Sequence, residues 1–234
     1  MKHLVFQLAA PLMSWGNEMA REERPSDGHP RKSAILGLLG AALGKPRSDP
    51  WHGESARTLG FATVVLRPGV RMIDYHTVAT PEGTKSYESR RDEAEVSDYT
   101  VQTLREYLSD AYFLVALWNG TPADLEKYAH FLEEPVWTPY AGRKCCSLSL
   151  PFAPRVLDTS TLEEAFQAYR LYEPLVPEEA EFSIYWERHP ATQLVSTSVS
   201  ARNDALISRE KKLFRTRDEY QGTLHLERRD HVSV

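Results

Sequence analysis

The stretch GHPRKSAILGLLGAALG, residues 28–44, decides the fold of the N-terminal half of this chain. Its apolar side chains and its glycines both recur every three or four residues, which is the spacing of a helix. The sequence therefore predicts a helix from about Pro30 to Leu43, with Gly44 as its C-terminal cap. An interior glycine costs a helix about 1 kcal/mol relative to alanine. We therefore interpret the glycine face as a flat surface that lies close to a sheet or to another chain.

The start of this helix carries Arg31, Lys32 and Ser33 beside the positive end of the helix dipole, an arrangement that predicts an anion site. A nucleotide-binding loop is excluded, because Lys45 is followed by Pro46 rather than by the serine or threonine of that motif. Two interpretations remain. The segment is either a buried helix with ordinary surface charges, or a contact with a nucleic-acid backbone that needs other basic segments to join it.

Composition sets the broad class. The chain has 234 residues, 41% of them hydrophobic, and a net charge of −5, which disfavours a nonspecific nucleic-acid binder. We find no signal peptide and no apolar run of membrane length, so we expect a cytoplasmic protein. Cys145 and Cys146 are adjacent, which fits reduced core thiols rather than a disulfide framework or a metal site. We predict no cofactor and no metal.

The charge is segregated along the chain. Residues 24–48 carry five cations against one acid, residues 135–157 carry three cations and no acid, and residues 202–217 carry six cations against two acids. Residues 158–187 carry eight acids against one cation. Convergence of the three basic segments on one surface would create a groove for a polyanion, with protein contacts or solvent elsewhere. Solvated faces also produce such clusters.

The order of the expected elements predicts an α+β fold. Strands at residues 3–9, 58–66, 111–118 and 148–152 are separated by the first helix, a hairpin arm at 70–78 and a helix that begins at Thr121 and Pro122. This is the split β-α-β order of a ferredoxin-like (RRM/RAMP) sheet. We expect this domain over residues 1–157, with a projecting polar excursion at 79–100. A smaller β-rich part at 158–234 would begin with a capping box at Ser160 and Glu163 and hold strands at 182–186 and 193–198.

Ferredoxin-like sheets commonly bind single-stranded RNA, which needs cations for phosphates and aromatic faces for bases. The candidate phosphate contacts come from the helix start, the basic glycine turn and, more weakly, the third basic segment. They are Arg24, Arg31, Lys32, Ser33, Arg143, Lys144, Arg209 and Lys211. The candidate stacking residues are Trp15, Tyr75 and Tyr140, each of which also suits a core position. His76, beside Tyr75, is typical of a hydrogen-bonding structural histidine.

Several motifs in order carry a resemblance to a known family. They are SWG at 14–16, RP at 24–25, PRKSAILGLLGAALG at 30–44, DYHTV at 74–78, REYLSDA at 105–111, ALW at 116–118 and TPYAGRKC at 138–145. Together they resemble the CasD family, the fifth-numbered CRISPR-associated proteins of the RAMP superfamily. The resemblance covers about residues 1–155, and its nearest subfamily is that of the type I-E Cascade complex.

The resemblance implies a noncatalytic subunit that binds the 5′ handle of CRISPR RNA in antiviral defence. It further implies that the subunit caps a filament of CasC backbone subunits, contacts the large CasA subunit and meets target DNA indirectly through the complex. The family's β-hairpin thumb falls on about residues 75–105. This thumb is longer and more acidic than the family pattern, so we assign its tip to a protein neighbour rather than to RNA.

Two alternatives remain open. The first is a metal-independent endoribonuclease that processes CRISPR precursor RNA, with an acid–base set drawn from Tyr75, His76, Lys85 and Tyr140. The resemblance to type I-E members implies instead that another subunit, CasE, cuts the precursor. The second alternative is a purely structural scaffold. It predicts no change in RNA affinity when Arg143 and Lys144 are replaced by alanine.

Overall fold

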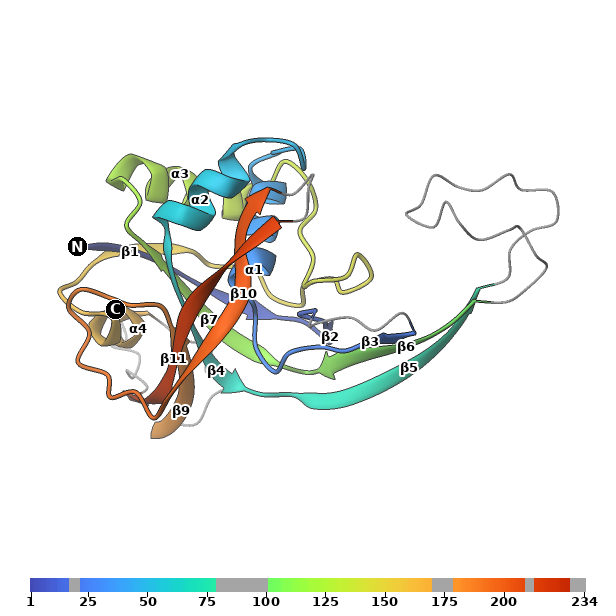
Figure 1. Cartoon of the computed structure of the whole chain (residues 1–234). Coiled ribbons are helices and arrows are strands. Elements are labelled where there is room, and N and C mark those ends of the chain that lie inside the picture. Colours follow the sequence, from blue (N-terminus) through green and yellow to red (C-terminus); the bar gives the residue numbers. More distant parts are fainter. Residues whose placement is uncertain (17–21, 79–100, 170–178, 209–212, 228–234) are drawn as a thin grey trace, which may run out of the picture.

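The computed structural model describes residues 1–16, 22–78, 101–169, 179–208 and 213–227 (Figure 1). These residues form an α+β fold with mostly antiparallel strands. In order, the elements are β1 (Lys2–Ala9), β2 (Leu12–Met13), β3 (Glu23–Arg24), α1 (Lys32–Ala42), α2 (Trp51–Thr58), β4 (Gly60–Arg67), β5 (Val70–Val78), β6 (Val101–Ser109), β7 (Tyr112–Trp118), α3 (Pro122–Glu133), β8 (Arg155–Asp158), α4 (Leu162–Ala168), β9 (Glu179–Trp186), β10 (Ser198–Ser208) and β11 (Leu213–Glu227).

The larger sheet has seven strands in the order β10-β11-β9-β4-β7-β1-β8, and every pair is antiparallel. Its N-terminal portion is β8-β1-β7-β4. The C-terminal strands β9, β11 and β10 continue this sheet beyond β4 and so share its core. A smaller sheet pairs β6 with β5 on one side and with β2 and β3 on the other. In Figure 1 its β5–β6 hairpin projects away from the body of the protein.

The core has two layers, one on each face of the larger sheet. β7 is buried along its whole length, and its side chains alternate between the layers. Phe113, Val115 and Leu117 pack with residues of α1, α2 and α3, whereas Leu114 and Ala116 pack with residues of α4. Burial on both faces explains why this stretch is uniformly apolar in sequence.

Helix α1 confirms the expectation for residues 30–44, with Leu43 as its C-cap. Gly44 follows with φ of +67°, and its amide donates to the Ala41 carbonyl while the Lys45 amide donates to the Gly40 carbonyl. These two bonds form a Schellman motif. Gly40 packs against α2, because a Cβ there would lie 2.4 Å from Cε1 of His52, whereas a Cβ on Gly44 would lie 2.8 Å from Cγ1 of Val136.

The local predictions missed β11, and they differ from the structure in four further places. Helix α2 was not predicted, and it begins at Trp51, directly after Pro50. Residues 148–152 alternate in sequence but form no strand, and β8 begins only at Arg155. The capping box is shifted by one residue, to Thr161 and Glu164. Residues 193–197 are irregular, and the strand there is β10, which begins at Ser198.

Candidate nucleic-acid interface

One face of the smaller sheet gathers arginines from different strands. Arg24 on β3 lies opposite Arg105 on β6, and Asp74 on β5 lies opposite Arg105 from the other side. Paired residues project to the same face of a sheet, and successive residues of a strand alternate between faces. Arg24 and Arg105 therefore share one face, together with His76 and Asp74. We call this the basic face, and Arg143, described next, is part of it.

Arg143 reaches the basic face from the turn that precedes β8. Its Nη2 donates a 2.9 Å hydrogen bond to the carbonyl oxygen of Arg24. Its guanidinium lies 4.4 Å from the centroid of the Tyr107 ring, and Tyr107 projects to the same face of β6 as Arg105. Arg143 Nη1 is buried and has no hydrogen-bond partner among the described residues. Two basic segments that are far apart in sequence therefore meet here.

The turn that carries Arg143 depends on a glycine. Gly142 has φ of +92°, and a Cβ at this position would lie 1.6 Å from the carbonyl oxygen of Ser14. Only glycine permits this conformation and this approach of two backbones. A 3.1 Å hydrogen bond from the Ser14 amide to the Ala141 carbonyl holds the turn against the loop after β2. Lys144, next in the turn, is exposed.

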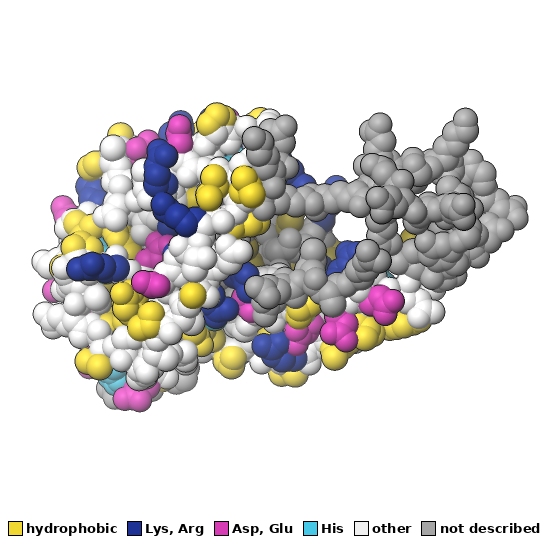
Figure 2. All heavy atoms as spheres, in the orientation of Figure 1, with side chains coloured by type: hydrophobic (Ala, Val, Ile, Leu, Met, Phe, Trp, Pro, Cys, Tyr) yellow, Lys and Arg dark blue, Asp and Glu magenta, His cyan; other side chains and the backbone are white. Residues whose placement is uncertain are grey.

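The opposite face of the hairpin is apolar at its surface. Ile73, Tyr75 and Leu104 are 68%, 57% and 40% exposed, and we call them the apolar face. Toward the body of the protein, Arg71 forms an ion pair with Glu106, whose carboxylate also accepts a 2.8 Å hydrogen bond from the Ser26 amide. Figure 2 shows hydrophobic and acidic side chains mixed along the hairpin on the side in view. Because successive side chains of a strand alternate between its faces, Tyr75 and His76 point to opposite sides of β5.

The other predicted cations belong to a different cluster, the ionic network. It joins residues 27–32 to the end of β9 and to β10 and β11, and it balances four cations with four acids. Its members are Arg31, Lys32, Arg202, Arg217, Asp27, Glu187, Asp204 and Glu219.

Arg217 is the centre of the ionic network. Its Nε lies 2.6 Å from Asp204 Oδ1 and its Nη2 lies 2.8 Å from Glu219 Oε2, while both carboxylate side chains are only 1% exposed. Lys32 Nζ lies 2.9 Å from Glu187 Oε2, and the Lys32 side chain is 3% exposed. Arg202 connects Glu219 at 2.6 Å to Asp27 at 3.6 Å. Each buried charge thus has an opposite charge within direct reach, as burial requires.

The predicted anion site at the start of α1 is therefore occupied by the protein itself. The amide of Lys32 donates a 3.0 Å hydrogen bond to Oδ2 of Asp204, which satisfies one of the unpaired donors of the helix end. Arg31 forms an ion pair with Asp27. The prediction that Arg31 and Lys32 point outward to a ligand was wrong, because a carboxylate from β10 fills the position of the expected anion.

The pKa shifts follow from this burial. Desolvation lowers the pKa of Lys32, and the neighbouring Glu187 only partly opposes this effect. For Arg217, burial also acts to lower the pKa, but the hydrogen bond and charge of Asp204, with the charges of Glu219 and Glu187, raise it further. Burial acts to raise the pKa of Glu106, yet the hydrogen bonds from Ser26 and Arg71 bring it below its ordinary value.

The structure places the remaining predicted residues as follows. Trp15 is 2% exposed and lies edge-on to Phe113 in the core, so it offers no free ring face for stacking. Ser33 and Tyr140 are half-buried. Arg209 and the neighbouring Lys211 lie outside the described residues, as does Lys85. Arg105 was not among the predicted site residues. The alternation of side chains along β6, together with the pairing of β6 with β3, is the signal that would have identified it.

Two further observations concern metal binding and membrane spans. Among the residues that the structure describes, no three histidine, cysteine, aspartate or glutamate side chains are grouped so that they could hold a metal ion. No helix within the described ranges has the length and apolar character needed to cross a membrane.

Comparisons with known proteins agree with this architecture. Residues 3–217 match the family model described as CRISPR-associated protein (Cas_Cas5). The chain is 35% identical over 193 residues to the CRISPR system Cascade subunit CasD of Escherichia coli (strain K12), covering 74% of this chain and 78% of that protein. It is similar to a chain of a solved CRISPR RNA-guided surveillance complex, with a TM-score of 0.73, 25% identity and coverage of 96% and 91%. It is also similar to a crystal structure of a Cas protein, with a TM-score of 0.65 and 26% identity, covering 97% of this chain and 95% of that chain. The chain therefore belongs to the Cas5 family of CRISPR-associated proteins.

Proposed function

We propose that this chain is a noncatalytic subunit of a type I-E CRISPR surveillance complex (Cascade) that binds the 5′ handle of CRISPR RNA. The convergence of Arg24, Arg105 and Arg143 on the basic face carries this proposal. Exposed Lys144 extends the charge along the same turn. Phosphate contacts supply most of the affinity for a nucleic-acid backbone, and arginine forks suit phosphates better than any other side chain.

The architecture supports the finer parts of the proposal. The antiparallel order β8-β1-β7-β4, with α1 and α3 on one face, supports the proposal of a ferredoxin-like (RAMP) sheet. We identify the β5–β6 hairpin with the family's thumb. The likeness to the Cascade subunit CasD and to a surveillance complex supports CasC-type backbone and CasA-type large subunits as partners, with a capping position on the filament. We divide the chain at residues 157 and 158, with the C-terminal strands as an extension of the sheet.

The noncatalytic assignment rests on the geometry of β5. Metal-independent RNA cleavage needs an acid and a base that both reach the reacting 2′-hydroxyl and phosphate. Tyr75 and His76 project to opposite faces of the strand, and the His76 ring contacts Asp74. A labelled precursor repeat incubated with the purified chain should therefore stay intact. Specific cleavage that disappears in His76→Ala would favour the endoribonuclease alternative.

The test of the proposed function is handle-RNA binding by charge variants. We expect Arg105→Gln combined with Arg143→Gln to weaken binding of a handle-bearing RNA at least about tenfold, because two phosphate contacts are lost. Lys127→Gln is the matched control, since it removes an exposed cation from α3 on the body of the protein. Equal losses in both proteins would contradict the basic face. No loss in either protein would favour a scaffold without an RNA contact.

A further inference from the structure

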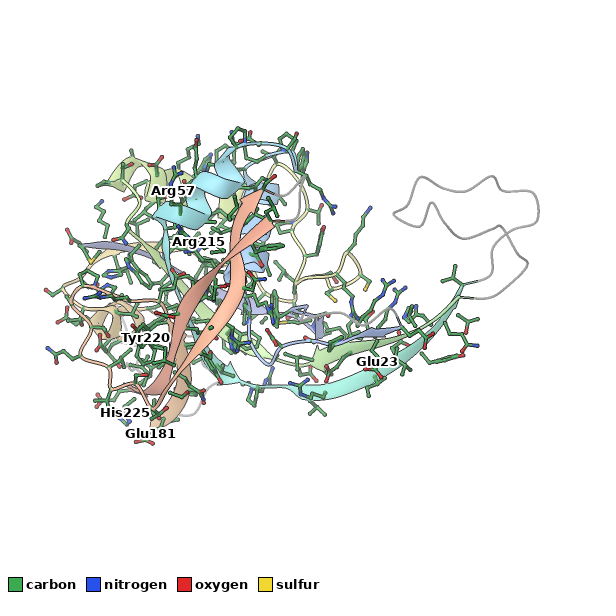
Figure 3. All side chains as sticks on the ribbon, in the orientation of Figure 1. Glu23, Arg57, Glu181, Arg215, Tyr220 and His225 are labelled. Carbon is green, nitrogen blue, oxygen red and sulfur yellow. The ribbon has the colours of Figure 1, made fainter. Side chains whose placement is uncertain are left out.

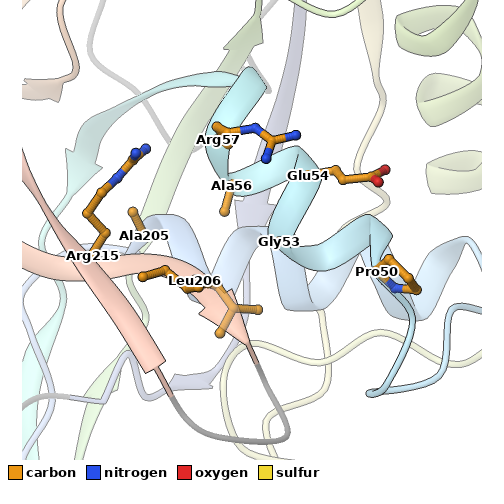
Figure 4. A pocket seen from close by; sticks show the side chains of 9 residues that line it. Pro50, Gly53, Glu54, Ala56, Arg57, Ala205, Leu206 and Arg215 are labelled. Atoms are coloured by element: carbon orange, nitrogen blue, oxygen red, sulfur yellow. The ribbon is translucent and has the colours of Figure 1, made fainter.

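A groove of about 420 Å³ lies between α2 and the β10–β11 hairpin, in a part of the chain that the proposed RNA site does not use (Figure 4). Its floor consists of Ala56, Ala205 and Leu206. Helix and strand touch closely along this floor, because a Cβ on Gly53 would lie 2.7 Å from the carbonyl oxygen of Ile207. The groove therefore lies where α2 and β10 pack closely at Gly53, rather than in a gap between separated elements.

Two arginines line the groove from different elements. Arg57 comes from α2 and Arg215 from β11 (Figure 3), and Figure 4 shows their side chains extending in different directions at the groove. Both are exposed, and neither forms a hydrogen bond or an ion pair within the described part of the chain. Arg217, only two residues after Arg215, contacts three carboxylates. Among the described residues that line the groove, Glu54 is the sole acid beside Arg57 and Arg215, so this described lining has a net positive charge.

The surroundings of the groove are unusually apolar for a free surface. Ile207, at the groove itself, is 56% exposed, and Leu213 and Phe214, just before Arg215, are 49% and 39% exposed. Arginine, aromatic and aliphatic side chains together are typical of the centre of protein–protein interfaces. The chemistry of the groove therefore fits a protein segment better than a nucleic acid.

We propose that this groove binds an acidic segment of a neighbouring protein subunit in the surveillance complex. An aliphatic or aromatic side chain of that segment occupies the floor, and carboxylates on either side of it form charge-assisted hydrogen bonds with Arg57 and Arg215. The groove alone is smaller than a stable interface, so it acts as one anchor within a larger contact. This inference rests on the proposed function, because it requires that the chain is part of a multi-subunit complex.

A photo-cross-linker tests the occupant of the groove directly. We would place p-benzoylphenylalanine at Ile207, assemble the complex with CRISPR RNA and its protein subunits, irradiate it and identify the cross-linked segment by mass spectrometry. We expect a peptide from another protein subunit with more carboxylates than cations, and we expect that Arg57→Glu combined with Arg215→Glu reduces the yield at least about fivefold. Cross-links to RNA, to a basic peptide or to nothing would overturn the proposal.

Two controls separate this inference from the proposed function. The same cross-linker at Lys127 reports background labelling of an exposed helix position outside the groove. Handle-RNA affinity and complex assembly of the unmodified chain are measured in the same experiment. If the chain assembles and binds RNA but Ile207 gives no acidic partner, the groove proposal fails and the proposed function stands. If the unmodified chain neither binds handle RNA nor assembles, the proposed function itself fails.

Discussion

The ionic network and the basic face are built from the same kinds of cation but differ in what opposes them. In the ionic network four cations meet four carboxylates of the same chain, and Arg217 is only 8% exposed. On the basic face, Arg143 is held by a backbone carbonyl and an aromatic ring, and Arg105 by the hydroxyl of Thr103 at 3.2 Å. These two partners are neutral, although Asp74 lies opposite Arg105 and Glu106 acts electrostatically on Arg143. The cations named on the basic face, Arg24, Arg105 and Arg143, therefore outnumber the acid that shares it, Asp74, whereas the cations and acids of the ionic network are equal in number.

The largest effect should be a loss of stability on removing Arg217, the central arginine of the ionic network. Arg217→Met leaves Asp204, Glu219 and Glu187 without their shared counter-charge, and breaking a buried ion pair costs about 3–5 kcal/mol. We expect a loss of that size in the free energy of unfolding, measured by urea denaturation. Arg215→Met is the matched control on the same strand, and its exposed side chain should change stability by at most about 0.5 kcal/mol. Similar losses in both variants would remove the distinction between the two arginines.

A third site, a buried pair of uncharged histidines, extends the comparison between the ionic network and the basic face. His3 Nε2 lies 2.9 Å from His189 Nε2, and burial together with the neighbouring His189 lowers the pKa of His3 to about 4. The Met1 amino group, Asp158 and Glu163 also act on this pair. The unfolded chain binds a proton near pH 6.5 and the folded chain only near pH 4, so stability is lost as the pH falls through this window.

We expect the free energy of unfolding to fall by up to about 3 kcal/mol between pH 7 and pH 4 from this histidine, because each pKa unit corresponds to about 1.4 kcal/mol. Urea denaturation at a series of pH values measures the slope. His3→Gln should flatten it, whereas His225→Gln should leave it unchanged, since the His225 side chain is exposed. An unaltered slope in His3→Gln would show that the pair does not stay neutral in the folded protein.

The smallest expected effect is a change in RNA affinity that distinguishes the basic face of the β5–β6 hairpin from its apolar face. His76→Ala changes the basic face and Tyr75→Ala changes the apolar face, although the residues are adjacent. We expect handle RNA to bind His76→Ala about two- to fivefold more weakly and Tyr75→Ala within about twofold of the parent, since loss of one hydrogen bond costs about 0.5–1.5 kcal/mol. Fluorescence anisotropy with labelled RNA measures both. The reverse order would place the RNA on the apolar face.

The sequence predicts elements well where the signal is local. The run at 111–118 and the helix start at Thr121 depend on neighbours in the chain, and both are confirmed, whereas the cap predicted at Gly44 lies one residue earlier, at Leu43. Helix α2 was missed because its start is marked by Pro46 and Pro50, which also mark chain breaks.

The site was harder to predict because charge pairing is a long-range property. Counting cations along the chain treated residues 202–217 as a source of positive charge, yet Asp204 in that stretch binds the amide of Lys32, 172 positions away. Arg143 was predicted as part of a basic turn, but its contact with Arg24 depends on strand pairing that cannot be read from the sequence. The alternation of β5 was visible, and it already assigns Tyr75 and His76 to different faces.

The salt dependence of handle-RNA binding tests the central claim most directly. Each phosphate contact to a single strand contributes about 0.7 to the slope of log K against log salt concentration, so Arg105→Gln with Arg143→Gln should lower the magnitude of the slope by about 1.4. Lys32→Met with Glu187→Met removes a buried ion pair without changing the net charge, and it should leave the slope unchanged. A slope that is unchanged in the first variant and reduced in the second would contradict the account, because the RNA would then bind the ionic network.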